Sequence, residues 1–168
     1  VDHSLISLDN LIDYSRVLSS SFELKHKRFK PVETLRKTVN SNMLEAEKKG
    51  VSFKIVCEDE NVIQIGDVSK MWHVFENLIK FVTSQSKKNS GVLIRCSSNE
   101  KEIRTEINFI AEKDLPGSIS KLIEGFNVDI DKTNLGIALS IKFIKAHEGN
   151  LCFSKSGDHS ALTVTSLL

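Results

Sequence analysis

GDVSKMWHVFENLIKFV, residues 66–82, carries the clearest helical pattern in the sequence. Its apolar residues recur every three or four positions, which is the spacing of one face of an α-helix. They are Val68, Met71, Trp72, Phe75, Leu78, Ile79 and Val82. The other side of the helix is polar and holds Lys70, His73, Glu76, Asn77 and Lys80. This pattern predicts an amphipathic helix whose apolar face packs into a core.

The sequence before this helix predicts two more helices and three extended segments. Pro31 favours a helix start and Gly50 a helix end, whereas alternating apolar residues favour strands. The basic run at residues 25–28 is typical of a strand edge or linker rather than of a binding patch. The predicted elements are an amphipathic helix over Leu5–Leu18, an extended connector over Phe22–Phe29, a helix over Pro31–Lys49, and strands over Val51–Cys57 and Val62–Ile65.

The sequence after residue 82 predicts two hairpins separated by two helices. The expected elements are a polar loop over Ser84–Ser90, strands over Gly91–Ser97 and Glu102–Ala111, a short helix over Ser118–Phe126, a polar loop over Asn127–Thr133, a helix over Leu135–Ala146, and strands over Asn150–Ser154 and Ser160–Leu167. Helices and strands in this order favour an α/β fold. We expect a two-layer sandwich in which helices cover one face of a mixed, mostly antiparallel sheet, preceded by an N-terminal helix.

Composition sets limits on location and partners. The chain has 168 residues, 40% of them hydrophobic, and a formal net charge of +1. No global field therefore draws it to nucleic acid or to an anionic membrane. No apolar run approaches the roughly 20 residues that span a bilayer. Three cysteines without a C-x-x-C pair indicate buried free thiols in a reducing cytoplasm; they are Cys57, Cys96 and Cys152.

Four segments in order resemble the sensor histidine kinases of the GHKL ATPase superfamily. Residues 11–16, LIDYSR, are similar to the end of the second dimerisation helix, and residues 66–79 resemble the start of the N box. Residues 119–126, ISKLIEGF, and residues 134–149 are similar to the later conserved segments. The resemblance implies a dimerisation-helix end over residues 1–21 and an ATP-binding type of domain over residues 22–168.

The resemblance also implies a metal site that this sequence lacks. The N box would place a second asparagine, a Mg²⁺ ligand, four residues after Asn77, and a phosphate-binding lysine three residues later. Those positions hold Phe81 and Ser84. A phenyl ring offers no oxygen to a cation that requires oxygen ligands.

The two glycine boxes of the family are incomplete as well. The D-x-G-x-G motif, which would contact adenine, has no counterpart in residues 111–117, although Glu112 or Asp114 could stand in for its aspartate. In the second box only Gly136 remains, and Asn134 and Lys132 take the preceding glycine positions. A helix start still presents N–H groups to an anion, so weak phosphate binding stays open.

We therefore expect a histidine-kinase-like domain without catalytic residues, metal or cofactor. Its expected role is regulation or docking within a two-component phosphorelay protein, either an inactive hybrid sensor or a histidine phosphotransfer protein. The expected partners are response-regulator or kinase domains and a second copy through the N-terminal helix, with no nucleic acid and no direct membrane contact. The alternative is an active kinase domain with unorthodox ATP contacts. We expect a cytoplasmic location, and an anchor of the whole protein in the inner membrane stays open.

The family's phospho-accepting histidine lies on the first dimerisation helix, upstream of the segment matched by residues 11–16. His3 lies on the second-helix side of that segment and is not expected to be the acceptor. His147 takes the histidine position of the family's H-G-G motif and is expected to be a helix-end residue, which the helix dipole favours there. The sequence begins inside a helical pattern, which is typical of a fragment of a longer protein.

Overall fold

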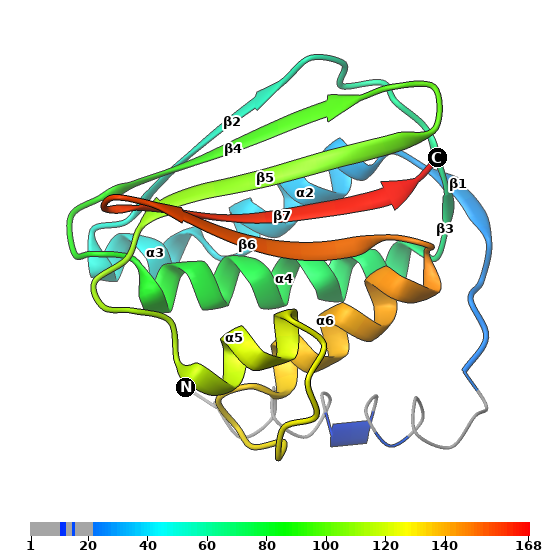
Figure 1. Ribbon diagram of the computed structural model, residues 1–168. Coiled ribbons are helices and arrows are strands. Elements are labelled where there is room, and N and C mark those ends of the chain that lie inside the picture. The colour runs from blue at the N-terminus through cyan, green and yellow to red at the C-terminus, as the bar shows by residue number, and fades with distance from the viewer. Residues whose placement is uncertain (1–10, 13–14, 16–21) are drawn as a thin grey trace.

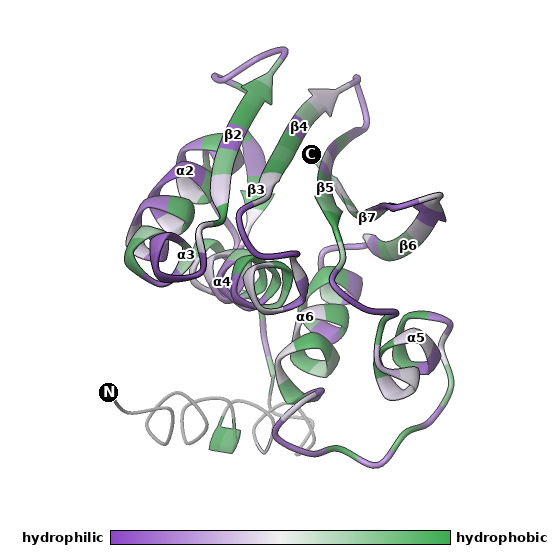
Figure 2. Ribbon diagram, turned by 90° about the vertical axis from the view of Figure 1, so that its left-hand side faces the viewer, coloured by the Kyte–Doolittle hydropathy of each residue, from purple (hydrophilic) through white to green (hydrophobic). Residues whose placement is uncertain are grey.

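The computed structural model describes residues 11–12, 15 and 22–168. Most of the helix predicted over residues 5–18 therefore lies outside the described residues. Leu11, Ile12 and Ser15 are helical and exposed. The rest of the chain forms two layers, with strands on one side and helices on the other (Figures 1 and 2).

The main sheet has five strands in the order β2-β4-β5-β7-β6. Its strands are β2 (Ser52–Cys57), β4 (Gly91–Ser98), β5 (Glu102–Ile110), β7 (His159–Leu167) and β6 (Asn150–Ser156). The β2–β4 pair is parallel, and the three other pairs are antiparallel. The prediction of a mixed, mostly antiparallel sheet is confirmed.

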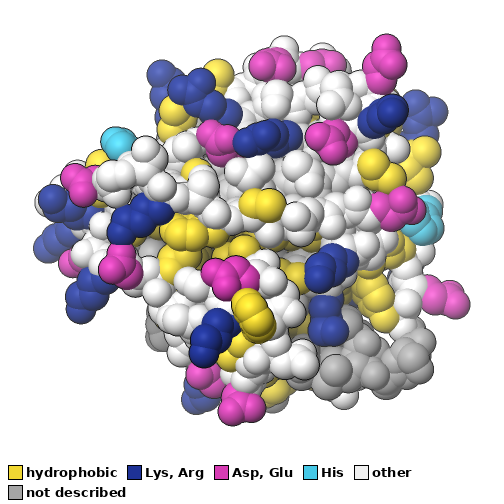
Figure 3. All heavy atoms as spheres, in the orientation of Figure 1, with side chains coloured by type: hydrophobic (Ala, Val, Ile, Leu, Met, Phe, Trp, Pro, Cys, Tyr) yellow, Lys and Arg dark blue, Asp and Glu magenta, His cyan; other side chains and the backbone are white. Residues whose placement is uncertain are grey.

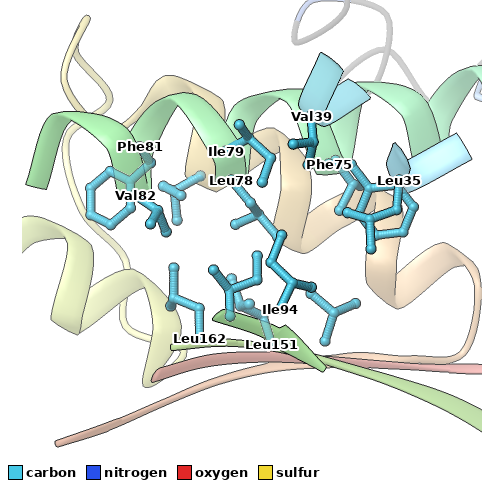
Figure 4. Packing of buried hydrophobic residues seen from close by; sticks show 14 of the residues in the cluster. Leu35, Val39, Phe75, Leu78, Ile79, Phe81, Val82, Ile94, Leu151 and Leu162 are labelled. Carbon is cyan, nitrogen blue, oxygen red and sulfur yellow. The ribbon is translucent and has the colours of Figure 1, made fainter. Parts of the chain in front are cut away.

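The helices cover one face of this sheet, as predicted (Figure 1). They are α2 (Pro31–Ser41), α3 (Met43–Lys49), α4 (Val68–Gln85), α5 (Gly117–Ile123) and α6 (Leu135–Ala146). Most of the predicted apolar face of α4 packs into the core, and Phe75, Leu78 and Ile79 are at most 2% exposed. Val68, the first residue of the helix, was assigned to that face but is 40% exposed. Inward side chains of the strands, such as Ile94 and Leu162, complete the core (Figure 4). Their burial supplies the main driving force for folding.

The helix predicted from Pro31 to Lys49 is wrong in one respect, because it breaks at Asn42 into α2 and α3. The side chains of Ser41 and Asn42 both donate to the Thr38 carbonyl, at 2.9 and 2.8 Å. Such side chains compete with the backbone for helical carbonyls and loosen the helix locally. The predicted stop is confirmed, because Gly50 has a φ of 72° and ends α3 in the left-handed conformation.

Several predicted boundaries also shift. α4 continues to Gln85 rather than ending before Ser84, and α5 spans Gly117–Ile123 rather than continuing to Phe126. Gly125, with a φ of 90°, prevents that continuation because the helix requires a negative φ. The first extended segment does not join the main sheet. Instead β1 (Lys27–Phe29) pairs antiparallel with β3 (Gln64–Gly66) in a separate two-stranded sheet.

The cysteine prediction holds for some of the thiols only. Cys96 is buried and Cys57 is half-buried, but Cys152 is exposed. Cys152 lies on β6, the edge strand, and its neighbours in that strand, Leu151 and Phe153, take the inward positions. Alternation along the strand therefore directs Cys152 away from the core.

The connector before α2 is fixed to the domain at one end of the helical layer. The Phe22 ring lies 5.4 Å from the Phe143 ring of α6, and the Lys70 ammonium of α4 lies over both rings. The backbone N–H of Lys25 donates to the Asp67 carboxylate at 3.0 Å. These contacts tie the segment that follows residue 21 to the start of α4 and the end of α6. Within the described residues, no helix has both the length and the apolar character needed to cross a membrane.

Candidate functional site

The crossing of α4 and α6 brings together two of the residues singled out in the sequence, Asn77 and Gly136. A methyl group on Gly136 would come within 3.2 Å of the Asn77 side-chain oxygen. The Asn77 side chain therefore lies directly against the first turn of α6. Its amide nitrogen is buried and has no hydrogen-bond partner among the described residues. A buried donor of this kind carries a desolvation cost.

Phe81, one turn further along α4, is part of the hydrophobic core. Its side chain is 9% exposed and belongs to the same buried cluster as Ile119 of α5 and Leu135 of α6. Figure 4 shows its ring beside Val82 at the C-terminal end of α4. The position that the resemblance assigns to a metal ligand is thus occupied by an apolar packing residue. The residues present do not fit a Mg²⁺ ion there, since a hard cation requires oxygen ligands.

Ser84, unlike the buried Phe81, lies at the molecular surface. Its hydroxyl donates to the Phe81 carbonyl at 2.7 Å, and its own carbonyl accepts from the Lys49 ammonium at 2.6 Å. It lines an open hollow of about 360 Å³ between α3 and α4. The other residues of that hollow are Asn42, Glu45, Lys48, Lys49, Lys80, Thr83 and Lys88. Asn77, Phe81 and Gly136 are not among them.

The two candidate substitutes for the adenine-binding aspartate are held at the surface by lysines. The Glu112 carboxylate lies 3.7 Å from the Lys49 ammonium, and its backbone N–H donates to the Gln85 carbonyl at 2.8 Å. The Asp114 side chain is 87% exposed and pairs with Lys155 of β6, whose hydrogen bond and charge lower the pKa of Asp114.

Asn134 has a specific structural role just before α6. It is fully buried, and its side-chain nitrogen donates to the Asp129 carbonyl at 2.9 Å. Its side-chain oxygen accepts from the backbone N–H of Asp131, also at 2.9 Å. The residue that replaces a glycine of the second box therefore closes the preceding loop onto the start of α6.

Asp131 completes this closure and was not identified from the sequence. Its carboxylate accepts from the backbone N–H groups of Thr133 at 2.8 Å and Asn134 at 3.1 Å. Its backbone carbonyl accepts from the N–H of Leu135 at 3.0 Å. Aspartate side chains often accept from backbone N–H groups two residues later in turns, so the pattern could have been found. The Asp131 carboxylate thus engages the N–H groups of the two residues before α6 and lies close to the start of that helix.

A second polar cluster lies at the opposite end of the α4–α6 pair. His147 ends α6 and is buried; its Nε2 accepts from the backbone N–H of Asp67 at 2.9 Å. Its Nδ1 lies 2.7 Å from the Phe143 carbonyl and must be the donor there. The predicted helix-end position of His147 is confirmed.

Comparisons with known proteins identify the class of fold. No protein-family model matches the sequence, and no curated protein is similar to it. Among solved structures, the histidine kinase AdeS of Acinetobacter baumannii has a TM-score of 0.78 at 16% identity, covering 95% of this chain and 76% of that one. The nucleotide-free catalytic domain of histidine kinase ThkA has a TM-score of 0.74 at 15% identity, covering 85% and 97%.

Full-length ShkA in complex with AMPPNP has a TM-score of 0.80 at 18% identity. The match covers 96% of this chain and 35% of ShkA. The chain therefore has the fold of the histidine-kinase catalytic, ATP-binding domain, a two-component kinase-like fold. At these identities the comparisons concern the fold, whereas function depends on the residues of the site.

Proposed function

We propose that this domain does not bind Mg²⁺-ATP and serves as a regulatory or docking module of a two-component phosphorelay protein. The observation that carries the proposal is the Asp131 carboxylate at the start of α6. It accepts from the N–H groups of Thr133 and Asn134, the two residues before α6, and places a negative charge beside the helix N-terminus where a phosphate would bind. A nucleotide phosphate at this helix start would meet the negative charge of the Asp131 carboxylate. Because that carboxylate is part of the chain, it cannot leave the site.

The core supports the same conclusion at the metal position. Burial of the Phe81 ring in the hydrophobic core stabilises the fold directly. Opening this region for a nucleotide would remove those contacts and expose apolar surface to water. A buried aromatic ring at this position therefore supports the proposal that the domain does not hold Mg²⁺-ATP there.

A regulatory role is supported by the connector. Phe22 and Lys25 contact Phe143 and Asp67, which lie at the joined ends of α6 and α4. A change in the position of residues 1–21 would therefore act on these two helices. In the whole protein, which we propose to be an inactive hybrid sensor or a histidine phosphotransfer protein, residues 1–21 would contribute to a dimer. Response-regulator or kinase domains of the phosphorelay would be the docking partners.

The face seen in Figure 3 fits a protein partner better than a polyanion. Basic and acidic side chains are interspersed across it rather than gathered by sign. Nucleic-acid binding uses clustered positive charge, and the formal net charge here is only +1.

Isothermal titration calorimetry with ATP and Mg²⁺ tests the proposal most directly. We expect a dissociation constant in the millimolar range or weaker. An active histidine-kinase catalytic domain serves as the positive control. A micromolar dissociation constant, about −8 kcal/mol, would contradict the proposal and favour an active kinase with unorthodox contacts. A thermal melt gives an independent readout, because only a ligand that binds the folded state raises Tm.

Docking requires its own experiment. Receiver domains and kinase domains of phosphorelays from the source organism would be immobilised, and binding of this chain would be measured without nucleotide. We expect at least one of these domains to bind. If none of them binds, the docking role is contradicted, whereas the conclusion on ATP is unaffected.

A further inference from the structure

Two of the three cysteines face each other across neighbouring strands. Cys57, the last residue of β2, is directly opposite Cys96 of β4 in the parallel register. The same row continues through Thr105 of β5, Val164 of β7 and Leu151 of β6. Cys57 and Cys96 both belong to the helix-covered side of the sheet, where Cys96 is in the buried core and Cys57 packs against it.

The geometry of a parallel pair fits a disulfide. Neighbouring strands lie about 4.8 Å apart, and residues opposite each other direct their side chains to the same face. A disulfide requires Cα atoms roughly 4.4–6.8 Å apart and side chains that converge. The register places this pair within that window without any shift of the backbone. Both residues are free thiols.

The surroundings give the two thiols different reactivity. Burial raises the pKa of the Cys96 thiol, and its hydrogen bond and charge interaction with Cys57 raise that pKa further. The Thr105 hydroxyl and the Arg36 guanidinium act in the opposite direction. Cys57 is half-buried and lies at the end of an edge strand. A small reagent therefore reaches Cys57 first, and Cys96 is the protected partner.

We propose that Cys57 and Cys96 form a modification site that closes reversibly into a disulfide by exchange with low-molecular-weight disulfides such as oxidised glutathione. The Cys57 thiolate attacks one sulfur of the reagent, which forms a mixed disulfide and releases one glutathione thiolate. Cys96 then loses its proton and attacks the Cys57 sulfur, which releases the second thiolate. Two protein thiols are oxidised and one glutathione disulfide is reduced to two thiols.

The disulfide fixes the edge of the sheet. β2 contacts the rest of the sheet through β4 alone, so that a covalent link at its last residue prevents its separation from β4. The site is independent of the nucleotide question, because neither cysteine lies near Asn77, Phe81 or Asn134 in sequence or belongs to the loop before α6. The proposal would stand if the domain were found to bind ATP.

The test uses the full chain with Cys152→Ser, which removes the exposed thiol. The folded protein is incubated with oxidised glutathione, quenched with acid, alkylated under denaturing conditions and analysed by mass spectrometry of proteolytic peptides. We expect the peptides containing Cys57 and Cys96 to be linked, and an added reductant to restore both thiols in the folded protein. Circular dichroism confirms that the protein stays folded throughout.

The matched control is the Cys57→Ser, Cys152→Ser variant, in which Cys96 should stay free because it lacks its partner and is buried. The proposal is overturned if both thiols stay free, if glutathione stays on Cys57 while Cys96 is alkylated, or if the disulfide links two chains. It is also overturned if reductant fails to reopen the bond in the folded protein.

Discussion

The His147 ring and the backbone N–H of Asp67 are joined by a hydrogen bond of 2.9 Å, although the two residues are 80 positions apart. This bond connects the C-cap residue of α6 to the N-cap residue of α4. The Asp67 carboxylate in turn accepts from the N–H groups of Lys70 at 3.1 Å and Lys25 at 3.0 Å. Three segments of the chain, namely the connector, α4 and α6, therefore meet in one buried polar cluster.

Position 66 lies so close to the His147 ring that this cluster leaves no room for a side chain there. A methyl group at Gly66 would lie 2.5 Å from a carbon of the His147 ring. We expect Gly66→Ala to displace the ring and to lower the free energy of unfolding by about 1–3 kcal/mol, the usual cost of overpacking. Urea denaturation followed by tryptophan fluorescence measures the loss.

Gly117→Ala is the matched control for Gly66→Ala. A methyl group at Gly117, the first residue of α5, meets nothing within 4 Å, and alanine favours a helix over glycine. The urea midpoint of Gly117→Ala should equal that of wild type or lie above it. Equal effects of the two substitutions would show that contact with His147 is not the cause.

Asp67 should stabilise the fold in a pH-dependent way. Burial raises its pKa, but hydrogen bonds from the N–H groups of Lys25 and Lys70 outweigh this and lower the pKa below its ordinary value of 3.8. A carboxyl with a lowered folded pKa stabilises above its unfolded pKa, and the stabilisation is lost as the pH falls through the folded pKa. The stability difference between wild type and Asp67→Asn should therefore be constant from pH 7 to about pH 5 and shrink below about pH 4.

At neutral pH we expect Asp67→Asn to cost about 1–3 kcal/mol, the range for hydrogen bonds to a charged group. Asp114→Asn serves as the control, because its pair with Lys155 is largely exposed and exposed pairs contribute little. Urea midpoints at several pH values test this. A pH-independent difference for Asp67→Asn would show that its charge contributes nothing.

The apolar face of α4 gives a third prediction. Phe75 is 2% exposed, so Phe75→Ala should cost about 3–5 kcal/mol through lost contacts and the cavity that remains. Trp72 is only half-buried, so Trp72→Ala should cost less. Thermal or urea melts followed by circular dichroism compare the two. If Phe75→Ala unfolds at the same midpoint as wild type, Phe75 does not contribute to the core.

Association is the fourth prediction, and it concerns residues 5–18, most of which lie outside the described residues. The apolar residues of 5–18 have the spacing of one helix face, and a single helix of this length is marginal without a partner. We expect a monomer or weak dimer for this chain, and a firm dimer for a longer piece that carries the preceding helix. Sedimentation velocity would distinguish these states.

The control for the association experiment compares two substitutions in the longer piece. Leu8→Glu on the apolar side should weaken the dimer, whereas Asp9→Lys on the polar side should not. A longer piece that stays monomeric at high concentration would remove the assignment of residues 1–21 to a dimerisation helix.

Local pattern was sufficient to predict most of the fold. The apolar residues of α4 repeat every three or four positions and those of β4 and β5 alternate, so each segment's buried face could be read directly. The break at Asn42 could not, because it results from side-chain hydrogen bonds to the Thr38 carbonyl that compete with a favourable helical pattern. Boundaries shifted where one residue, such as Gly125, decided the backbone conformation.

The site was predicted less completely because its contacts are long-range. The residue type alone shows that Phe81 cannot bind a metal. That Phe81 lies in the same core cluster as Ile119 and Leu135 depends on how α4, α5 and α6 pack. The pairing of Cys57 with Cys96 depends on strand register, and the bond from Asp67 to His147 depends on two helix ends meeting. Neither leaves a signal in the local sequence.

Asp131 provides the last prediction, since it determines whether the start of α6 can hold an anion. Its carboxylate accepts from the N–H groups of Thr133 and Asn134. Asp131→Ala should free those groups and remove a negative charge beside them, which allows weak phosphate binding at a helix N-terminus. We expect millimolar binding of inorganic phosphate, seen by NMR as shifts of the amides of residues 133–136. Loss of these two hydrogen bonds should also cost about 1–3 kcal/mol of stability.

The control is Asp129→Ala, which removes the same charge from the same loop. Asp129 holds Asn134 through its backbone carbonyl at 2.9 Å rather than through its carboxylate, so this substitution leaves the N–H groups of Thr133 and Asn134 engaged. Wild type and Asp129→Ala should show no phosphate-dependent shifts at those amides. If Asp129→Ala responds as Asp131→Ala does, general charge rather than the carboxylate's hydrogen bonds opposes the anion. If wild type responds as well, Asp131 does not close the start of α6, and the main support for a domain without nucleotide is lost.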